Sequence, residues 1–213
     1  MKSISSDSLW RVFAKRYQLN DLQQDQFKRY MHALTQWKEF GNITAIVDEQ
    51  AIVELHFEDA LALTKFIDFS QITSIADIGS GGGVPGVPLA IKFPHLRVYL
   101  VEVSHKKIMF LERLLQELNV TNITIVPLDW RTFLRKTEYT IDLFCARASL
   151  AVSELIRMFK PSSPYKHARL IYWASHDWQA QKYVELLVKA RWHYGVGGRE
   201  RQLILLHNGD NGN

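Results

Sequence analysis

The chain of 213 residues contains one cysteine, Cys145, and no long uncharged apolar run. A single cysteine excludes a disulfide framework within the chain and is typical of a reducing compartment. Residues 1–11 mix serine, aspartate, lysine and tryptophan and lack the apolar run of a signal peptide. No stretch approaches the roughly 18 apolar residues that cross a membrane. We therefore expect a cytoplasmic protein with no membrane partner.

Two functional patterns are also absent. The eight histidines are never three or four residues apart, so together with one cysteine they predict no metal site. No Gly-Lys-Ser or Gly-Lys-Thr follows the glycine-rich segment, which argues against a nucleotide triphosphatase. The net charge of +4 fits a nucleic-acid partner, although many ordinary enzymes carry such a charge.

Hydrophobic periodicity divides the chain into segments. Residues 1–70 show helical spacing and predict an N-terminal helical extension, with Asp21 capping its second helix and Gly41-Asn42 ending it. Residues 71–207 alternate short β-branched runs with amphipathic runs, which is typical of an α/β fold with a doubly wound, mainly parallel sheet. The last two strand candidates predict an antiparallel C-terminal edge. Residues 208–213 are expected to form a polar tail. Expected strands are 74–78, 97–103, 122–127, 140–146, 168–174, 192–196 and 201–207, and expected helices are 57–66, 85–93, 105–118, 131–136, 151–159 and 176–189.

The most informative segment is the glycine loop, residues 77–86 (DIGSGGGVPG), after the first expected strand. Its glycines allow a sharp turn and close approach of a ligand, and Pro85 suits the first turn of a helix. Gly81, Gly83 and Gly86 have dinucleotide spacing, whereas an acidic residue before G-x-G-x-G is typical of S-adenosylmethionine sites. Asp77 favours S-adenosylmethionine because its carboxylate repels a pyrophosphate and attracts an ammonium. A purely structural turn is the alternative. The expected cofactor-binding residues of this loop are Asp77, Gly79, Ser80, Gly81, Gly83 and Pro85.

Acidic residues follow the next two expected strands. Glu102, with Val103 beside it, stands where a carboxylate can accept hydrogen bonds from ribose hydroxyls, unless it is only a solvated charge. Asp129 could accept from an adenine amino group while Trp130 packs on the ring. Asp129 could equally cap the helix that follows it.

Several other residues are candidates for positioning cofactor or substrate. Arg147, after the fourth expected strand, could hold cofactor, a phosphate or a base, or it could pair with a carboxylate such as Asp59. His56 and Asp59 share a helical face and could line the pocket or form a structural pair. Lys106 and Lys107 open a helix, where cations oppose the dipole, so an RNA phosphate or a solvated basic face would explain them.

The glycine loop and the segment after the second expected strand resemble the GidB/RsmG family of bacterial methyltransferases. The resemblance rests on 77–91 (DIGSGGGVPGVPLAI) and 102–111 (EVSHKKIMFL), with support from Trp37, 42–44 (NIT), 56–59 (HFED), 146–148 (ARA) and 200–204 (ERQLI). It implies a class I, Rossmann-like methyltransferase fold and transfer from S-adenosylmethionine to N7 of a guanine in small-subunit (16S) ribosomal RNA. It also implies a monomer acting on the small ribosomal subunit, with Arg147 and Arg201 among the RNA contacts.

The chemistry of this reaction is consistent with the sequence. Guanine N7 carries a lone pair and no proton, so transfer needs alignment and no general base, and we find no catalytic acid or base. Cys145, inside an expected strand, reads as a small buried apolar residue. The chain departs from the family where Asp129-Trp130-Arg131 replaces Arg-x-Glu and Ala174-Ser175 replaces Lys-Gly. A methyltransferase with another RNA target, a non-catalytic RNA-binding relative and an NAD(P)-dependent oxidoreductase remain alternatives.

Overall fold

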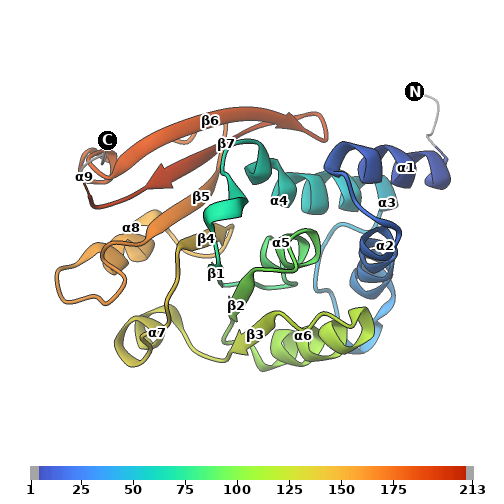
Figure 1. The fold of residues 1–213 in the computed structure, drawn as a ribbon, viewed down its shortest axis with the longest axis horizontal. Helices are drawn as coiled ribbons and strands as arrows, with labels where there is room; N and C mark the ends of the chain where they lie inside the picture. The colour runs from blue at the N-terminus through green and yellow to red at the C-terminus, as the bar shows by residue number, and fades with distance from the viewer. Residues whose placement is uncertain (1–4, 210–213) are drawn as a thin grey trace.

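The computed structural model describes residues 5–209 and forms one seven-stranded sheet of order β3-β2-β1-β4-β5-β7-β6. Strands β1 to β5 are parallel, whereas β7 pairs antiparallel with both β5 and β6 (Figure 1). This confirms the doubly wound, mainly parallel sheet with an antiparallel C-terminal edge. The strands are β1 (Ser74–Ile78), β2 (Arg97–Val101), β3 (Ile123–Val126), β4 (Leu143–Arg147), β5 (Arg169–Ser175), β6 (Val188–Val196) and β7 (Arg199–Leu206).

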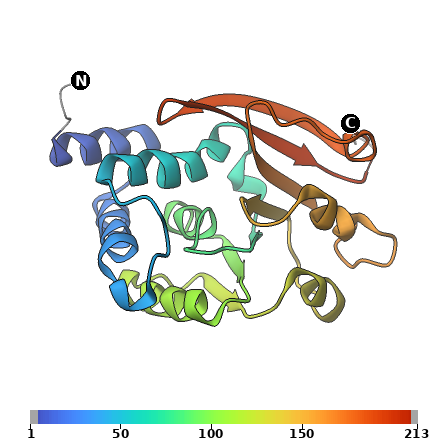
Figure 2. The same ribbon diagram turned by 180° about the vertical axis from the view of Figure 1, so that it is seen from behind.

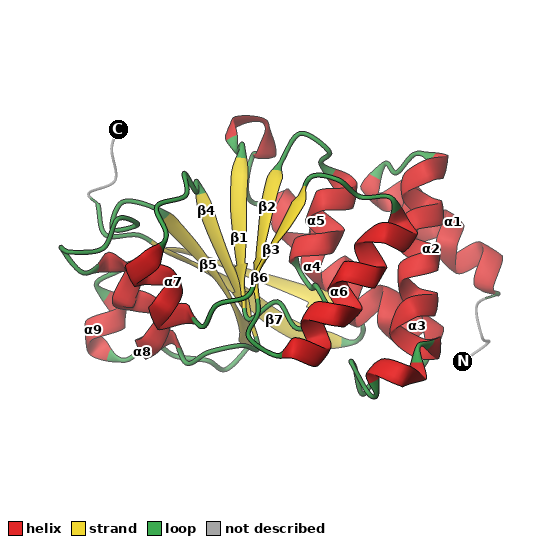
Figure 3. Cartoon of the chain, turned by 90° about the horizontal axis from the view of Figure 1, so that it is seen from below, coloured by secondary structure: helices red, strands yellow, loops and turns green. Residues whose placement is uncertain are grey.

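Helices cover both faces of this sheet. Figure 3 shows α5 (Gly86–Lys92) and α6 (His105–Leu118) on one side, and α7 (Trp130–Lys136), α8 (Val152–Leu155) and α9 (Lys182–Glu185) on the other. A 3-10 turn, Ile156–Phe159, continues α8. Each face buries its own apolar cluster, because strands of a doubly wound sheet present side chains to both layers.

The N-terminal segment packs on the α5–α6 side. Its helices are α1 (Ser6–Tyr17), α2 (Asp21–Gln36) and a continuous run of α3 (Glu49–Ile52), a π-helical turn (Val53–Glu58), α4 (Asp59–Leu61) and a 3-10 turn (Ala62–Lys65); short 3-10 turns occupy Lys38–Phe40 and Phe69–Gln71. This run lies beneath the β6–β7 hairpin (Figure 2). One apolar core extends from Trp10 and Phe13 on α1 to Ile171 on β5. The expected boundary between an N-terminal extension (1–70) and a methyltransferase domain (71–207) stays a prediction. Residues 1–4 of the extension and 210–213 of the expected polar tail lie outside the described residues.

Helix boundaries correct several expectations. Asn20, and not Asp21, caps α2: its side chain accepts from Gln23 N–H, and the Gln23 side chain accepts from Asn20 N–H. The helix ends at Gln36, well before Gly41. The helix expected at 57–66 already begins at Glu49, where Asp48 caps it.

The helix expected at 176–189 is wrong. Only α9 is helical there, and β6 begins at Val188. The Gln202 side chain donates to the carbonyl oxygens of Ser175, His176 and Trp178, so it fixes the segment after β5 as a loop. These contacts reach across the sheet, and a local apolar pattern does not reveal them.

Cys145 lies in the interior of β4 and is fully buried, as expected for a small apolar residue. Burial raises the pKa of its thiol well above the usual range, which disfavours the thiolate needed for nucleophilic attack. Within residues 5–209, His, Cys, Asp and Glu side chains do not gather in threes as metal ligands. No helix in the same range has the length and apolar character to cross a membrane.

Candidate functional site

The glycine loop links β1 to α5 at the carboxyl end of the sheet. Gly79, Gly81 and Gly83 have φ angles of +68°, +59° and +95°. A residue with a side chain would be strained in this backbone conformation. The N–H groups of Gly79 and Ser80 both donate to the Val101 carbonyl oxygen, at 2.8 and 3.2 Å. The end of β2 therefore holds the loop in place.

Asp77, at the end of β1, is buried behind this loop and is only 1% exposed. Its Oδ2 accepts from the Gly86 N–H at 2.8 Å, which fixes the start of α5. Its Oδ1 has no partner. Burial raises the pKa of the carboxyl to about 7, against the opposing effects of the Gly86 hydrogen bond and the Arg147 charge.

Glu102 ties the loop to the end of β2. Its Oε2 accepts from the Gly81 N–H at 2.8 Å, and its Oε1 accepts from the N–H groups of Val103 and Ser104, both at 2.9 Å. The residue is 6% exposed. Three backbone donors thus hold the carboxylate at the sheet edge, as a binding residue on a rigid frame requires.

A cavity of about 280 Å³ opens beside Glu102. It lies where strand order reverses between β1 and β4, the usual ligand site of an open α/β sheet. A larger groove of about 520 Å³ runs along α7, but no residue of the glycine loop lines it. The smaller cavity is therefore the candidate site. Its lining residues are Ile78, Gly79, Val101, Glu102, Val103, Lys107, Leu128, Asp129, Trp130, Ala148, Ser149 and Leu150.

Five of the residues expected to bind cofactor line this cavity, and the other six do not. The lining set is Gly79, Glu102, Val103, Asp129 and Trp130, joined by Lys107, which we expected to contact RNA. Lys106, beside it on α6, is exposed and does not line the cavity, and its Nζ lies next to Gly41. Ser80, Gly81, Gly83 and Pro85 shape the loop without lining the cavity.

Asp129 caps α7 and also lines the cavity, so its binding of an adenine amino group stays a prediction. As the N-cap of α7, it accepts from Thr132 N–H at 3.0 Å and from the Thr132 hydroxyl at 2.6 Å. The hydroxyl and backbone hydrogen bonds of Thr132 lower the pKa of the carboxyl. Trp130 is 5% exposed and donates its Nε1–H to the Glu154 carbonyl oxygen at 2.9 Å. Both residues are therefore held rigidly while they face the cavity.

A second polar cluster, the Asp59 cluster, joins Asp59, Arg147, Arg201, Tyr194 and His56. Asp59 is fully buried. It accepts from Arg147 Nε at 2.7 Å and from the Tyr194 hydroxyl at 2.6 Å, and Arg201 Nε lies 3.5 Å away. Charged hydrogen-bond partners of this kind offset the desolvation of a buried carboxylate.

His56 completes this cluster. Its Nε2 lies 2.8 Å from the Thr44 hydroxyl, and its Nδ1 lies 3.5 Å from Arg147 Nη2. Burial, with the Arg147 charge, lowers the pKa of His56 to about 4, so the ring is neutral near pH 7. Arg147 also donates to the Leu55 carbonyl oxygen at 2.5 Å. Arg147 therefore stands at the end of β4, as expected, but does not line the cavity, and its carboxylate partner is Asp59.

The sequence did not single out the turn after β4. Ala148 has φ of +51°, and a Cβ on Gly79 would lie 2.6 Å from the Ser149 Cβ, so this turn and the glycine loop pack closely. The hydroxyl of Ser149, like that of Ser80, is buried without a partner. We call Asp77, Ser80 and Ser149 the glycine-loop cluster. The position of Ser149 just after a strand that ends at the site was the available signal.

The model of the GidB family, described as rRNA small subunit methyltransferase G, matches residues 23–195. The chain belongs to this family. Relatives named ribosomal RNA small subunit methyltransferase G include that of Geobacillus sp., 41% identical over 64% of this chain and 58% of the relative. The relative of Staphylococcus aureus is 36% identical over 68% of this chain and 61% of its own length. The chain thus spans only about three fifths of the curated relatives that it matches.

Solved structures agree with the fold. The chain is similar to TrmK of M. capricolum in complex with S-adenosylhomocysteine, with a TM-score of 0.54 and 17% identity over 70% of this chain and 66% of the other. It is also similar to the putative methyltransferase yhhF of Escherichia coli, with a TM-score of 0.55 and 12% identity over 71% and 88% of the two chains. At such identities the likeness establishes a class I methyltransferase fold. Neither finding favours an oxidoreductase.

Proposed function

We propose that the protein transfers a methyl group from S-adenosylmethionine to N7 of a guanine in small-subunit ribosomal RNA. One observation carries the proposal: three buried polar atoms without partners lie in the glycine-loop cluster, which borders the cavity. Buried polar atoms are almost always hydrogen-bonded, so these atoms fit a ligand that carries charged groups. Membership of the GidB family supports the reaction and the RNA substrate.

The residues of the cavity fit this cofactor. Glu102 uses three of the roughly four acceptor sites of its carboxylate on backbone N–H groups, which leaves Oε2 free to accept from one ribose hydroxyl. Asp129 retains acceptor capacity on both oxygens for an adenine amino group. The unpartnered oxygens of the glycine-loop cluster fit the amino-acid end, where the Asp77 carboxylate favours an ammonium.

The bound cofactor supplies an electrophilic methyl group on a sulfonium. The chain's own task is to align that group with the base and to exclude water. Guanine N7 gives up no proton on attack, so the neutral His56 and the ion-paired Asp59 are not needed as a base. We assign them, with Arg147 and Arg201, to positioning the wall of the site through the Asp59 cluster. A monomer acting on ribosomal RNA in the cytoplasm completes the proposal.

Calorimetry with S-adenosylmethionine tests the cofactor site. Glu102→Gln keeps a side-chain acceptor for the Gly81 N–H but removes the charge, and we expect binding about tenfold weaker, since hydrogen bonds to charged groups contribute about 1.5–3 kcal/mol. Glu112→Gln, an exposed position on α6, is the matched control and should bind as the wild type does. Equal affinities for all three proteins would contradict the assignment of Glu102.

Methyl transfer tests the reaction. Small ribosomal subunits that lack the modification are incubated with the protein and radiolabelled cofactor, and the labelled nucleoside is identified by mass spectrometry. We expect N7-methylguanosine. Another methylated nucleoside would contradict the proposed target, and RNA binding without any transfer would identify a non-catalytic relative.

A further inference from the structure

The positive charge of the chain is concentrated in one segment. Residues 130–169 contain eight Lys and Arg against three Asp and Glu, a net charge of +5, whereas the rest of the chain contains 18 against 19. This segment runs from the first residue of α7 to the first residue of β5 and includes β4, and its helices α7 and α8 lie on one face of the sheet (Figure 3). Arg147 of this segment belongs to the Asp59 cluster, but a concentration of the remaining basic residues is the electrostatic footprint of a nucleic-acid partner.

Four of the eight basic residues of this segment line a groove of about 520 Å³ between α7 and the turn after α8. Arg131 and Arg135 lie on the α7 side, Arg157 and Lys160 on the opposite side, and Glu138 is the single acidic lining residue. We call the groove formed by Arg131, Arg135, Arg157 and Lys160 the basic groove. Leu134, Thr137, Ser162, Ser163 and Pro164 complete its wall. The charged side chains that line the groove are therefore four cations and one carboxylate.

Internal ion pairs do not neutralise the groove. Glu154 lies between Arg131, which donates to it through Nε at 2.9 Å and Nη2 at 3.0 Å, and Arg157, whose Nε is 3.0 Å away. One carboxylate therefore serves two guanidinium groups. Within residues 5–209, neither Arg135 nor Lys160 has an ion-pair partner. The paired arginines are held in place while the other two cations are available to an anion.

The groove begins beside the candidate cofactor cavity. Trp130, which lines the cavity, immediately precedes Arg131 on α7, and its indole donates to the Glu154 carbonyl oxygen. Glu154, which pairs with Arg131 and Arg157, thus also holds Trp130 in the wall of the cavity. An RNA strand that brings its target base to the edge of this cavity, beside the bound cofactor, would place its neighbouring phosphates along α7.

We propose that the basic groove binds the phosphodiester backbone of the RNA strand that carries the target base. The inference rests on the proposed function and adds to it a surface distinct from the glycine loop and from the Asp59 cluster. Arginine forks and lysine ammonium groups recognise phosphate oxygens through charge-assisted hydrogen bonds. Such contacts fix the register of a nucleic acid without reading its sequence.

The groove continues into a hollow with an aromatic wall. Arg157 and Lys160 also line this hollow, together with Tyr183 of α9 and Leu186, the residue that follows α9. Tyr183 is 50% exposed and Leu186 is 81% exposed. An exposed aromatic ring beside cations suits a stacked base next to a bound phosphate.

The test is RNA binding as a function of salt. The probe is fluorescently labelled small-subunit ribosomal RNA transcribed in vitro, and the full chain is titrated at several salt concentrations. For Arg135→Ala/Lys160→Ala we expect a salt slope smaller by about 1.4, because each phosphate contact on a single strand contributes about 0.7. Arg135→Lys/Lys160→Arg should restore the wild-type slope.

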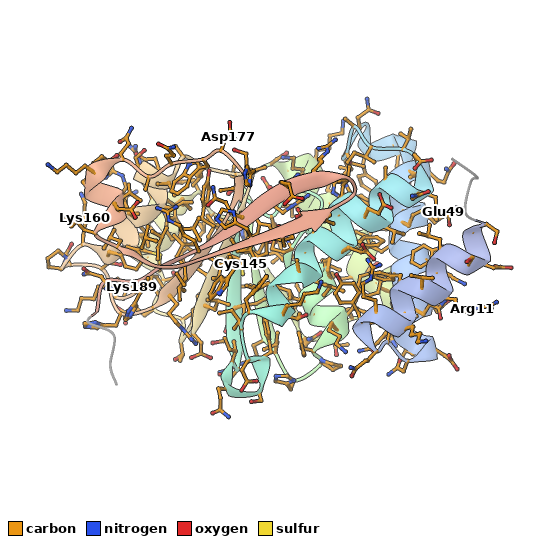
Figure 4. The ribbon with its side chains drawn as sticks, turned by 90° about the horizontal axis from the view of Figure 1, so that it is seen from above. Arg11, Glu49, Cys145, Lys160, Asp177 and Lys189 are labelled. Atoms are coloured by element: carbon orange, nitrogen blue, oxygen red, sulfur yellow. The ribbon has the colours of Figure 1, made fainter. Side chains whose placement is uncertain are left out.

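The matched control is Arg11→Ala/Lys15→Ala on α1, where two exposed cations also border a surface hollow. Figure 4 shows Arg11 and Lys160 at opposite ends of the molecule. The control should keep the wild-type slope. Tyr183→Ala should weaken binding severalfold and leave the slope unchanged, because stacking releases no counterions.

Two results separate this inference from the proposed function. If the Arg135→Ala/Lys160→Ala variant keeps the wild-type affinity and slope while the wild type transfers methyl groups, the groove does not bind RNA and the function stands. If the groove variant lowers the slope but the wild type methylates no RNA, the binding surface stands and the function fails. All variants should bind S-adenosylhomocysteine as the wild type does, which verifies folding independently of RNA.

Discussion

The two polar clusters at the carboxyl ends of the strands differ in how their atoms are partnered. In the Asp59 cluster the central carboxylate accepts hydrogen bonds from an arginine and a tyrosine and faces a second arginine. In the glycine-loop cluster one carboxylate oxygen and two hydroxyls have no partner, although all three are buried. The Asp59 carboxylate thus has partners within the chain, and Arg201 Nε, which is buried without a hydrogen bond, still lies 3.5 Å from Asp59 Oδ1. The glycine-loop cluster costs free energy until a ligand supplies partners, so we infer that the first cluster is structural and that the second marks a binding site.

The largest expected effect comes from removing the central carboxylate of the Asp59 cluster. Asp59→Ala leaves Arg147 buried without its counter-charge, and we expect the free energy of unfolding to fall by about 3–5 kcal/mol. Urea denaturation of the purified protein measures this change. Glu185→Ala, which removes an exposed partner of Arg191, is the control and should cost less than about 1 kcal/mol. A loss at Asp59 no larger than at Glu185 would contradict the structural role of the cluster.

The clusters also predict opposite pH dependences. Asp77 has a folded-state pKa of about 7, raised above its unfolded value near 3.9, so its contribution to stability is full below about pH 4 and is lost as pH rises towards 7. His56 has a folded-state pKa of about 4, lowered from about 6.5, so its contribution is present above about pH 6.5 and is lost as pH falls towards 4. In the wild type the two trends oppose each other between these values.

Single variants should separate the two trends. Between about pH 5 and 7, Asp77→Asn should make the free energy of unfolding rise with pH by about 2 kcal/mol, because Asp77 no longer opposes the His56 contribution. His56→Gln should make it fall by about 2 kcal/mol over the same range. Urea denaturation at a series of pH values measures both slopes. Parallel curves for the wild type and both variants would show that neither group titrates as its surroundings imply.

The same comparison explains what the sequence could predict. The glycine loop, Glu102 and Asp129 follow successive strands, and strand ends of a parallel sheet meet at one edge, so local pattern sufficed to bring them together. Asp59 bonds to Arg147 and Tyr194, which lie 88 and 135 positions away in the chain, and the sequence could only name Asp59 as one possible partner of Arg147. The false helix at 176–189 has the same cause, because long-range contacts of Gln202 override its local periodicity.

The smallest effect is also the most specific to the binding site. Ser149→Ala removes a buried hydroxyl that has no partner, so we expect the free energy of unfolding to stay the same or to rise. Affinity for S-adenosylmethionine should fall about fivefold, because a hydrogen bond contributes about 1 kcal/mol. Thr44→Val is the matched control, because the Thr44 hydroxyl forms a hydrogen bond with His56 of the Asp59 cluster. It should lower stability by about 1 kcal/mol and leave cofactor affinity unchanged. If Ser149→Ala lowers stability and spares binding instead, the unpartnered atoms of the glycine loop do not mark a ligand site.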